Sequence, residues 1–165
     1  MEKARKHPAL EELLAGHARF QERRPSLPQT HAPQFAVLTC ADARVDPANV
    51  FDAAPGELFV VRTAGNVACK HALESLAFAA GLGVEAIIVL GHSDCGAMKD
   101  ALSDRPRLAA TATKIRAHLE GEGELDAAAR RHARKTAREV EGALASRVPV
   151  FAAYYRIESG EVEWL

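Results

Sequence analysis

Three short apolar runs constrain the fold of this chain more than any other feature of its sequence. They lie at 35–39, 58–61 and 86–90, and each is closed by polar or glycine residues. Runs of this length and composition are typical of strands that are buried on both faces of a parallel sheet. Between the last two lies 68–80, rich in alanine and leucine, which predicts a crossover helix packed on that sheet. The pattern therefore predicts an α/β fold.

The first part of the chain predicts a helical arm rather than another layer of the sheet. From Pro8 to Arg23 the apolar residues recur at roughly helical spacing, and Pro25, Pro28 and Pro33 follow. We interpret 1–33 as an arm with its linker. The whole of 1–165 is expected to form one domain, because a chain of 165 residues suits a single core.

The part of the chain after the third run predicts more helices and then a hairpin. Helices are expected at 96–102, 108–120 and 125–145. The ending 148–165 predicts a strand, a tight turn at 158–160 and a short return strand. The sheet is therefore expected to be mostly parallel and flanked by helices, with an antiparallel C-terminal edge.

Charge and cysteine usage exclude several classes of partner. Lys and Arg number 21 against 22 Asp and Glu, so the chain has no excess of positive charge to hold nucleic acid or an anionic membrane. No apolar run approaches the roughly 18 residues that a spanning helix needs, so we expect a cytoplasmic protein. Three unevenly spaced cysteines indicate metal or catalytic use in a reduced compartment rather than a disulfide framework.

Reactive side chains follow two of the three predicted strands. Cys40, Asp42 and Arg44 come after the first strand, and His92 and Cys95 come after the third. Ligand crevices form at the carboxyl ends of neighbouring strands in open parallel sheets, so these segments are expected to meet there. Thiolate and imidazole are good zinc ligands, and three protein ligands leave the fourth tetrahedral position free, as in catalytic sites. The pattern predicts an open zinc site at Cys40, His92 and Cys95.

Each of these residues taken alone also has an ordinary structural explanation. A single cysteine at a strand end is more often a small buried apolar residue than a ligand, and a His-x-x-Cys pair alone is a weak motif. Asp42 and Arg44 suit a turn carboxylate and a solvated cation equally well. The joint occurrence of Cys-x-Asp-x-Arg after one strand and Gly-His-x-x-Cys-Gly after another favours the metal site.

Further motifs give the chain a family resemblance. Residues 35–102 resemble the core of the beta-class carbonic anhydrases through CADAR at 40–44, PGELFV at 55–60, RTAGN at 62–66 and GHSDCGA at 91–97. The resemblance implies that Cys40, His92 and Cys95 bind zinc. It implies that Asp42 and Arg44 form a dyad beside the zinc-bound water, and that the protein works as a homodimer or a larger homo-oligomer.

The reaction that this resemblance implies is the reversible hydration of carbon dioxide to bicarbonate and a proton, by attack of zinc-bound hydroxide. Two thiolates cancel the charge of the zinc ion, so such a site is expected to lower the pKa of its bound water less than a three-histidine site does. Other residues must therefore contribute. Asp42 is expected to accept the hydroxide's hydrogen bond, while Arg44 keeps that carboxylate ionised and oriented. Two alternatives stay open: a carbonyl sulfide or carbon disulfide hydrolase on the same zinc site, and a non-catalytic zinc-stabilised domain that binds bicarbonate.

The resemblance also implies a substrate pocket that contains Phe59, Ala64 and His31. Phe59 matches the aromatic residue of the family pocket, whereas His31 stands where a glutamine is common and Ala77 replaces a tyrosine. Val37 stands where members with an inhibitory bicarbonate site often carry tryptophan. His31 is open to two interpretations, a proton shuttle and an exposed loop histidine. Substrate contacts are therefore expected to differ from those of the family.

Overall fold

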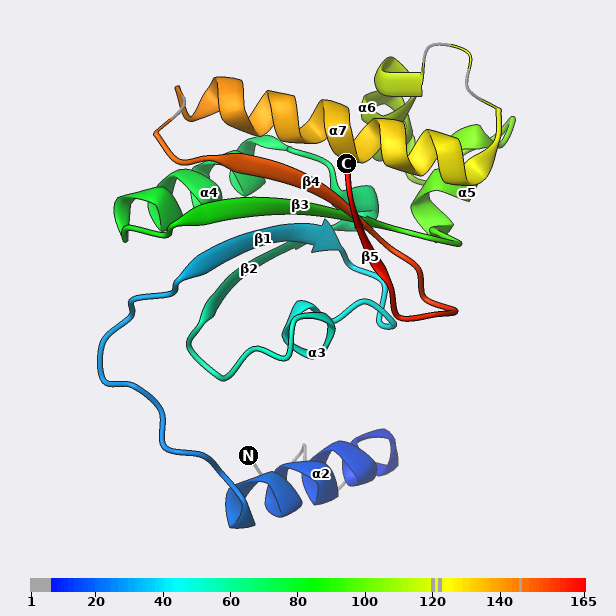
Figure 1. The fold of residues 1–165 in the computed structure, drawn as a ribbon. Helices are drawn as coiled ribbons and strands as arrows, with labels where there is room; N and C mark the ends of the chain where they lie inside the picture. Colours follow the sequence, from blue (N-terminus) through cyan, green and yellow to red (C-terminus); the bar gives the residue numbers. More distant parts are fainter. Residues whose placement is uncertain (1–6, 120, 122, 146) are drawn as a thin grey trace.

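A five-stranded sheet forms the centre of the protein (Figure 1). The computed structural model describes residues 7–119, 121, 123–145 and 147–165. The strands lie in the order β2-β1-β3-β4-β5, with bounds β1 Phe35–Cys40, β2 Leu58–Thr63, β3 Ala86–His92, β4 Val150–Tyr155 and β5 Val162–Trp164. The first four are parallel, and β5 runs antiparallel to β4. The predicted α/β fold with an antiparallel C-terminal edge is confirmed.

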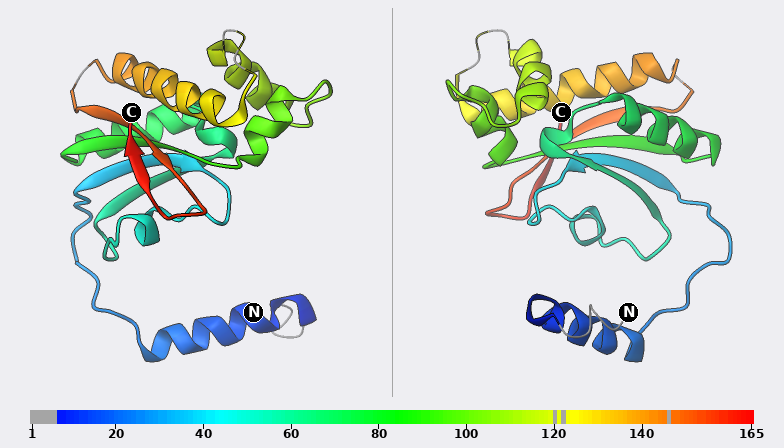
Figure 2. Two further views of the ribbon diagram at one scale, coloured as in Figure 1. Left: turned by 45° about the vertical axis from the view of Figure 1, so that its right-hand side comes forward. Right: turned by 180° about the vertical axis from the view of Figure 1, so that it is seen from behind.

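Helices cover the two faces of the sheet unequally (Figures 1 and 2). The helices α4 (Lys70–Gly81) and α7 (Leu125–Ala143) pack on one face, and the short α3 (Pro47–Val50) lies on the other. Two more helices, α5 (Gly96–Leu102) and α6 (Ala109–Leu119), follow the carboxyl end of β3. The helices α5 and α6, together with the start of α7, therefore pack around the sheet edge where the predicted ligands lie.

Side-chain alternation explains why the three runs look continuously apolar. In β1, Leu38 faces the core beneath α4 and α7, where Leu76 and Val140 also pack. The preceding residue, Val37, faces the opposite side together with Ile88. Both faces of the central strands are therefore buried, as parallel sheets require.

The structure differs from the sequence prediction mainly in short elements and element ends. Strands β1 and β3 include Cys40 and His92, because the backbone ladder continues to these residues. The helix α3 and the 3-10 turn η2 (Ala64–Asn66) were not predicted, since segments of three or four residues show no periodicity. The helix expected at 108–120 ends at Leu119, and Glu120 lies outside the described residues.

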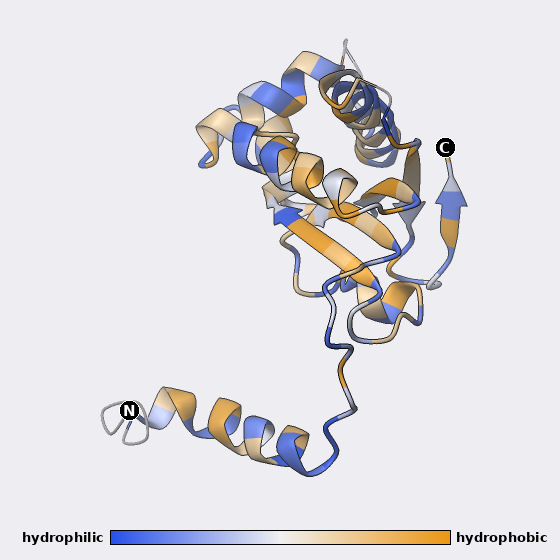
Figure 3. Ribbon diagram, turned by 90° about the vertical axis from the view of Figure 1, so that its left-hand side faces the viewer, coloured by the Kyte–Doolittle hydropathy of each residue, from blue (hydrophilic) through white to orange (hydrophobic). Residues whose placement is uncertain are grey.

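The N-terminal helix stands apart from the sheet in every view of Figures 1, 2 and 3. It consists of a 3-10 turn η1 (Pro8–Leu10) followed by α2 (Glu11–Glu22), and none of the residues of α2 is buried. The predicted helix is confirmed. The prediction that 1–165 form one domain, with 1–33 as its helical arm and linker, stays a prediction. None of the described helices has the length and hydropathy needed to cross a membrane, and the cytoplasmic location also stays a prediction.

Candidate metal centre

Two cysteines and a histidine meet at the carboxyl edge of the sheet. Cys40 ends β1, His92 ends the neighbouring strand β3, and Cys95 precedes the first turn of α5. Their possible ligand atoms all lie within 4.8 Å of one another. All three are buried, with exposures of 4%, 1% and 2%. Within the described part of the chain, this is the one group of three or more histidine, cysteine or acidic side chains with metal-site spacing.

The sulfur separation fits a metal site and not a disulfide. The Sγ atoms of Cys40 and Cys95 lie 3.9 Å apart, and both cysteines are free. A disulfide would bring the sulfurs to about 2.05 Å. Two thiolates at ~2.3 Å from one tetrahedral zinc lie roughly 3.8 Å apart. The observed spacing therefore suits a zinc ion held between them.

The imidazole of His92 is oriented so that one nitrogen is left for a metal ion. Its Nδ1 lies 2.8 Å from the carbonyl oxygen of Ser93, and a carbonyl can only accept, so Nδ1 carries the proton. Nε2 then holds a lone pair, and this buried atom has no hydrogen-bond partner among the described residues. Buried polar atoms are rarely left unpaired, so the vacant lone pair fits a metal ligand.

The hydrogen bond between the two thiols shifts their pKa values in opposite directions. A hydrogen bond from Cys95 lowers the pKa of Cys40 to about 4 against the opposing effect of burial, and His92 and the Gly65 amide add to this shift. The thiolate at Cys40 in turn raises the pKa of Cys95. A divalent cation would take the place of the proton that the two sulfurs share, because metal ligation requires deprotonated thiols.

An aspartate and an arginine form a bidentate ion pair in the loop after Cys40. Arg44 donates from Nε to Asp42 Oδ1 at 3.0 Å and from Nη2 to Oδ2 at 2.8 Å. The backbone amide of Arg44 also donates to Oδ1, at 3.0 Å. The guanidinium holds the pKa of the Asp42 carboxyl well below its usual range. Asp42 is therefore a fixed, ionised acceptor two residues from a candidate ligand.

Asp94 was missed by the sequence analysis although it lies inside the His-x-x-Cys motif. Its Oδ2 lies 3.0 Å from Arg44 Nη1, and its backbone carbonyl accepts from Nη2 at 3.3 Å. Lys99 also pairs with this carboxylate. Asp94 has φ of 55°, a left-handed conformation that aspartate adopts more readily than most residues. Arg44 therefore joins the two motif loops through an aspartate on each.

Arg62 fixes the same loop from β2. It donates to the carbonyl oxygens of Cys40 at 3.1 Å, Asp42 at 2.6 Å and Val45 at 2.7 Å. The position of Arg62 in the RTAGN stretch marked it as part of the family core, but its carbonyl partners follow only from the folded loop. Its role here is to hold the backbone that carries Cys40 and Asp42.

The structure separates the predicted pocket residues. Ala64 opens η2 and packs against the buried group that includes Cys40 and Cys95. Phe59 instead lies in an aromatic group with His31 and Phe78, at centroid distances of 5.9 Å and 6.2 Å.

Strand register shows how far this aromatic group lies from the ligands. Phe59 pairs with Ala36, four residues before Cys40 in β1. Four residues of strand span roughly 13 Å. The structure therefore does not bring Phe59 to the metal ligands of the same chain.

Together these features define an α/β protein with a buried Cys2His metal centre and an ion-paired aspartate beside it. Comparison with known proteins gives the family. A family model described as carbonic anhydrase matches residues 35–146. The chain belongs to the beta-class carbonic anhydrase family.

Individual relatives support this assignment over different parts of the chain. A carbonic anhydrase of Mycolicibacterium smegmatis is 47% identical over 83 residues, which are 50% of this chain and 40% of the relative. Beta carbonic anhydrase 3 of Arabidopsis thaliana is 32% identical over 123 residues, which cover 65% of this chain and 48% of the relative. The chain thus spans about half or less of these relatives. The structure of the beta-carbonic anhydrase CcaA has a TM-score of 0.80 at 26% identity, with 96% of this chain and 92% of that chain covered.

Proposed function

We propose that this protein is a carbonic anhydrase that reversibly hydrates carbon dioxide to bicarbonate and a proton, with zinc held by Cys40, His92 and Cys95. The observation that carries the proposal is the convergence of three buried ligands, one with an unpartnered Nε2, beside an ionised aspartate. Zinc, when bound, supplies a Lewis acid that lowers the pKa of a coordinated water. These residues lie within the part of the chain that matches the family.

The residues around the ligands suit a small uncharged substrate. Ala64 and Val67 adjoin the buried group that contains both cysteines, so apolar surface borders the site. Such surface favours a molecule that needs few hydrogen bonds, as carbon dioxide does. Asp42 is ionised and can only accept hydrogen bonds, so it can orient an O–H group at the site by accepting that group's hydrogen bond. Arg44 prevents the carboxylate from turning away.

We expect the zinc-loaded protein to hydrate carbon dioxide, measured by stopped-flow with a pH indicator. Carbonyl sulfide and carbon disulfide are assayed in parallel, since these linear molecules are alternative substrates for hydrolysis at the same site. Turnover of the sulfur substrates alone would replace the proposal with a hydrolase. Stoichiometric zinc without turnover of any of the three would favour the non-catalytic bicarbonate-binding domain.

We also propose that the protein assembles as a homodimer or larger homo-oligomer. The helix α2 has 12 residues and buries none of them, although Leu13, Leu14 and Phe20 are apolar. An isolated helix of this length is marginal in water. Figure 3 shows hydrophobic segments along this free-standing helix. A second copy of the chain that covers α2 would supply the packing that its own chain does not provide.

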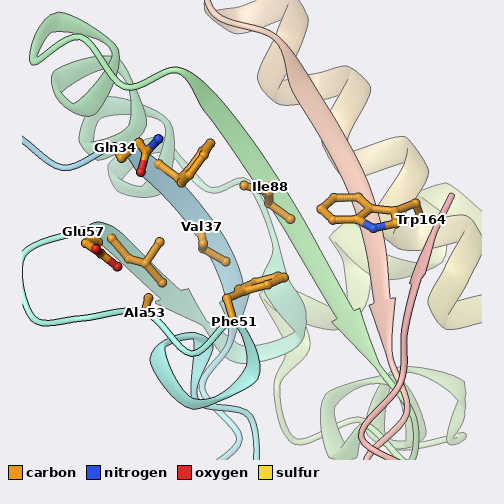
Figure 4. A pocket seen from close by; sticks show the side chains of 9 residues that line it. Gln34, Val37, Phe51, Ala53, Glu57, Ile88 and Trp164 are labelled. Atoms are coloured by element: carbon orange, nitrogen blue, oxygen red, sulfur yellow. The ribbon is translucent and has the colours of Figure 1, made fainter.

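The sheet face opposite α4 and α7 carries only the short helix α3 and leaves apolar side chains exposed near its C-terminal edge. A mostly apolar hollow of about 310 Å³ lies on this face. Figure 4 shows Val37, Ile88 and Trp164 among the side chains that line it. Trp164 is 60% exposed and Phe151, beside it, is 50% exposed. The same assembly would account for the predicted pocket role of Phe59. Because Phe59 lies far from its own metal ligands, its proposed pocket role requires contact with the site of another copy.

We expect replacement of both Leu13 and Leu14 by aspartate to convert the oligomer to monomer, because two carboxylates on the apolar side of α2 would be costly to bury. Molar mass by size-exclusion chromatography with light scattering is the measurement. Leu108→Asp is the matched control, since Leu108 is 42% exposed and Leu14 38% exposed, but Leu108 lies outside the arm. An unchanged mass in the double variant would remove α2 from the interface.

A further inference from the structure

Two buried histidines lie close to the metal centre without a role in the proposed reaction. His118 on α6 is 7% exposed and His132 on α7 is 1% exposed. Their Nδ1 atoms lie 2.9 Å apart. Burying two imidazoles is costly unless their nitrogens form hydrogen bonds. When every member of a buried polar network is paired, the network also fixes one particular arrangement of the groups around it. The partners of this pair therefore indicate what it holds in place.

A continuous series of hydrogen bonds joins the histidine pair to a candidate metal ligand. His132 Nε2 lies 2.9 Å from the carbonyl oxygen of Gly65. The amide of Gly65 donates to the sulfur of Cys40 at 3.3 Å. At the other end, His118 Nε2 lies 3.2 Å from Glu139 Oε1. The series thus runs from a partly exposed carboxylate on α7 to the Cys40 thiolate.

The acceptors in this series determine where its protons lie. The Gly65 carbonyl can only accept, so His132 carries its proton on Nε2. Burial, and then the charge of His118, lower the pKa of His132 to about 4, so this ring is neutral near pH 7 and its Nδ1 accepts. His118 must then donate from its own Nδ1. Thr136 Oγ1, 3.4 Å from His132 Nε2, is a weaker second partner.

Gly65 needs an external restraint because its own backbone is permissive. Its φ of 68° lies in the left-handed region. A Cβ there would stand 2.9 Å from Ile115 Cδ1 and 3.1 Å from Ala97 Cβ, so the space between α5 and α6 requires glycine. Glycine is also the residue with the most conformational freedom to lose. The hydrogen bond from His132 fixes the carbonyl of the same residue whose amide donates to Cys40.

We propose that His132, oriented by His118 and Glu139, is a positioning residue of the metal centre that holds the Gly65 amide on the Cys40 sulfur. The inference rests on the proposed function only in taking Cys40 as a metal ligand. The N–H···S hydrogen bond stabilises the thiolate and limits its rotation. Groups that orient metal ligands in this way typically contribute about 10- to 100-fold to metal affinity or activity.

The test compares two replacements of His132. In His132→Leu the donor to Gly65 is lost, and zinc affinity is expected to fall roughly 10-fold or more. In His132→Gln the amide nitrogen restores a donor, and most of the affinity should return. Zinc affinity is measured by competition with a chromophoric chelator. A cobalt-substituted sample reports on the sulfur directly, through the energy of its thiolate-to-cobalt absorption band, which should shift in His132→Leu and return in His132→Gln.

A control separates this role from general destabilisation of the core. Val140→Ala removes buried volume from α7 in the core group that contains neither Cys40 nor Cys95, without touching the hydrogen bonds, so it should lower thermal stability and leave zinc affinity unchanged. If His132→Leu does not fold, His118→Phe keeps the packing and removes the Nδ1 donor, and it should weaken zinc binding in the same direction.

Two results would overturn the inference. One is wild-type zinc affinity with an unshifted cobalt band in a folded His132→Leu or His118→Phe variant. The other is a ¹⁵N NMR spectrum that places the proton of His132 on Nδ1. The proposed function fails separately, since it would be refuted by a wild-type protein that binds no zinc.

Discussion

Replacing Cys95 with serine is expected to abolish stoichiometric zinc binding and carbon dioxide hydration together. A serine hydroxyl stays protonated near neutral pH, so the site would keep only Cys40 and His92 as ligands. Structural zinc sites bind with ~10–16 kcal/mol. Losing one ligand in three or four would remove ~3–5 kcal/mol of this, which weakens binding roughly 100- to 5000-fold. Elemental analysis after dialysis against a chelator, with stopped-flow turnover on the same sample, measures both losses.

Cys69 provides the matched control for this substitution. It is the third free cysteine, half-buried at the start of α4 and outside the ligand group. Cys69→Ser should therefore keep full zinc content and full turnover. Cys95→Ser with undiminished zinc and turnover would show that the ligand assignment is wrong. Loss of both in the Cys69 variant as well would indicate a general sensitivity to thiol replacement and remove the support for a specific site.

The convergence of Cys40, His92 and Cys95 could be predicted because it follows from local patterns and one rule of topology. Apolar runs located the strands, and parallel strands end at a common edge. The structure adds that β1 and β3 are adjacent in the sheet. The ion pair between Asp42 and Arg44 was predictable for a similar reason, since the two residues share one loop.

Contacts between distant elements could not be predicted in this way. His132 is 67 residues from Gly65, and their hydrogen bond depends on how α7 lies over η2. No periodicity in α7 distinguishes a histidine that holds a turn from one that fills the core. The location of Phe59 shows a limit of the family resemblance. A family match assigned it to the pocket, but strand register places its Cα roughly 13 Å from the level of Cys40 in the same chain.

Replacing Arg44 with alanine is expected to lower carbon dioxide turnover roughly 10- to 100-fold while zinc content is retained. The substitution removes two side-chain hydrogen bonds to Asp42 and one to the carboxylate of Asp94. The pKa of Asp42 should rise towards its ordinary value of about 3.9, at which the carboxylate is still ionised at pH 7. The loss therefore reflects the orientation of Asp42 and not its charge. Stopped-flow turnover and elemental analysis on the same preparation separate the two quantities.

Arg107→Ala is the matched control, because Arg107 is an exposed arginine that also lies near an aspartate, Asp100, at 3.7 Å. It should leave turnover unchanged. Unchanged turnover in Arg44→Ala would defeat the dyad, and loss of zinc would make Arg44 a structural residue of the metal site. A crystal structure of the zinc-loaded protein near neutral pH with Asp42 bound to the metal would contradict the open site but leave the three ligands unaffected.

A double-mutant cycle decides whether Arg44 acts through Asp42. Asp42→Asn removes the ionised acceptor and should lower turnover at least as much as Arg44→Ala does. If the arginine works only by orienting this carboxylate, the double variant should be no slower than Asp42→Asn alone, because residues that act as a unit are not additive. Additive losses would instead assign Arg44 a second role. The structure offers its link to Asp94 as the basis for that role, since this contact joins the two loops that carry the ligands.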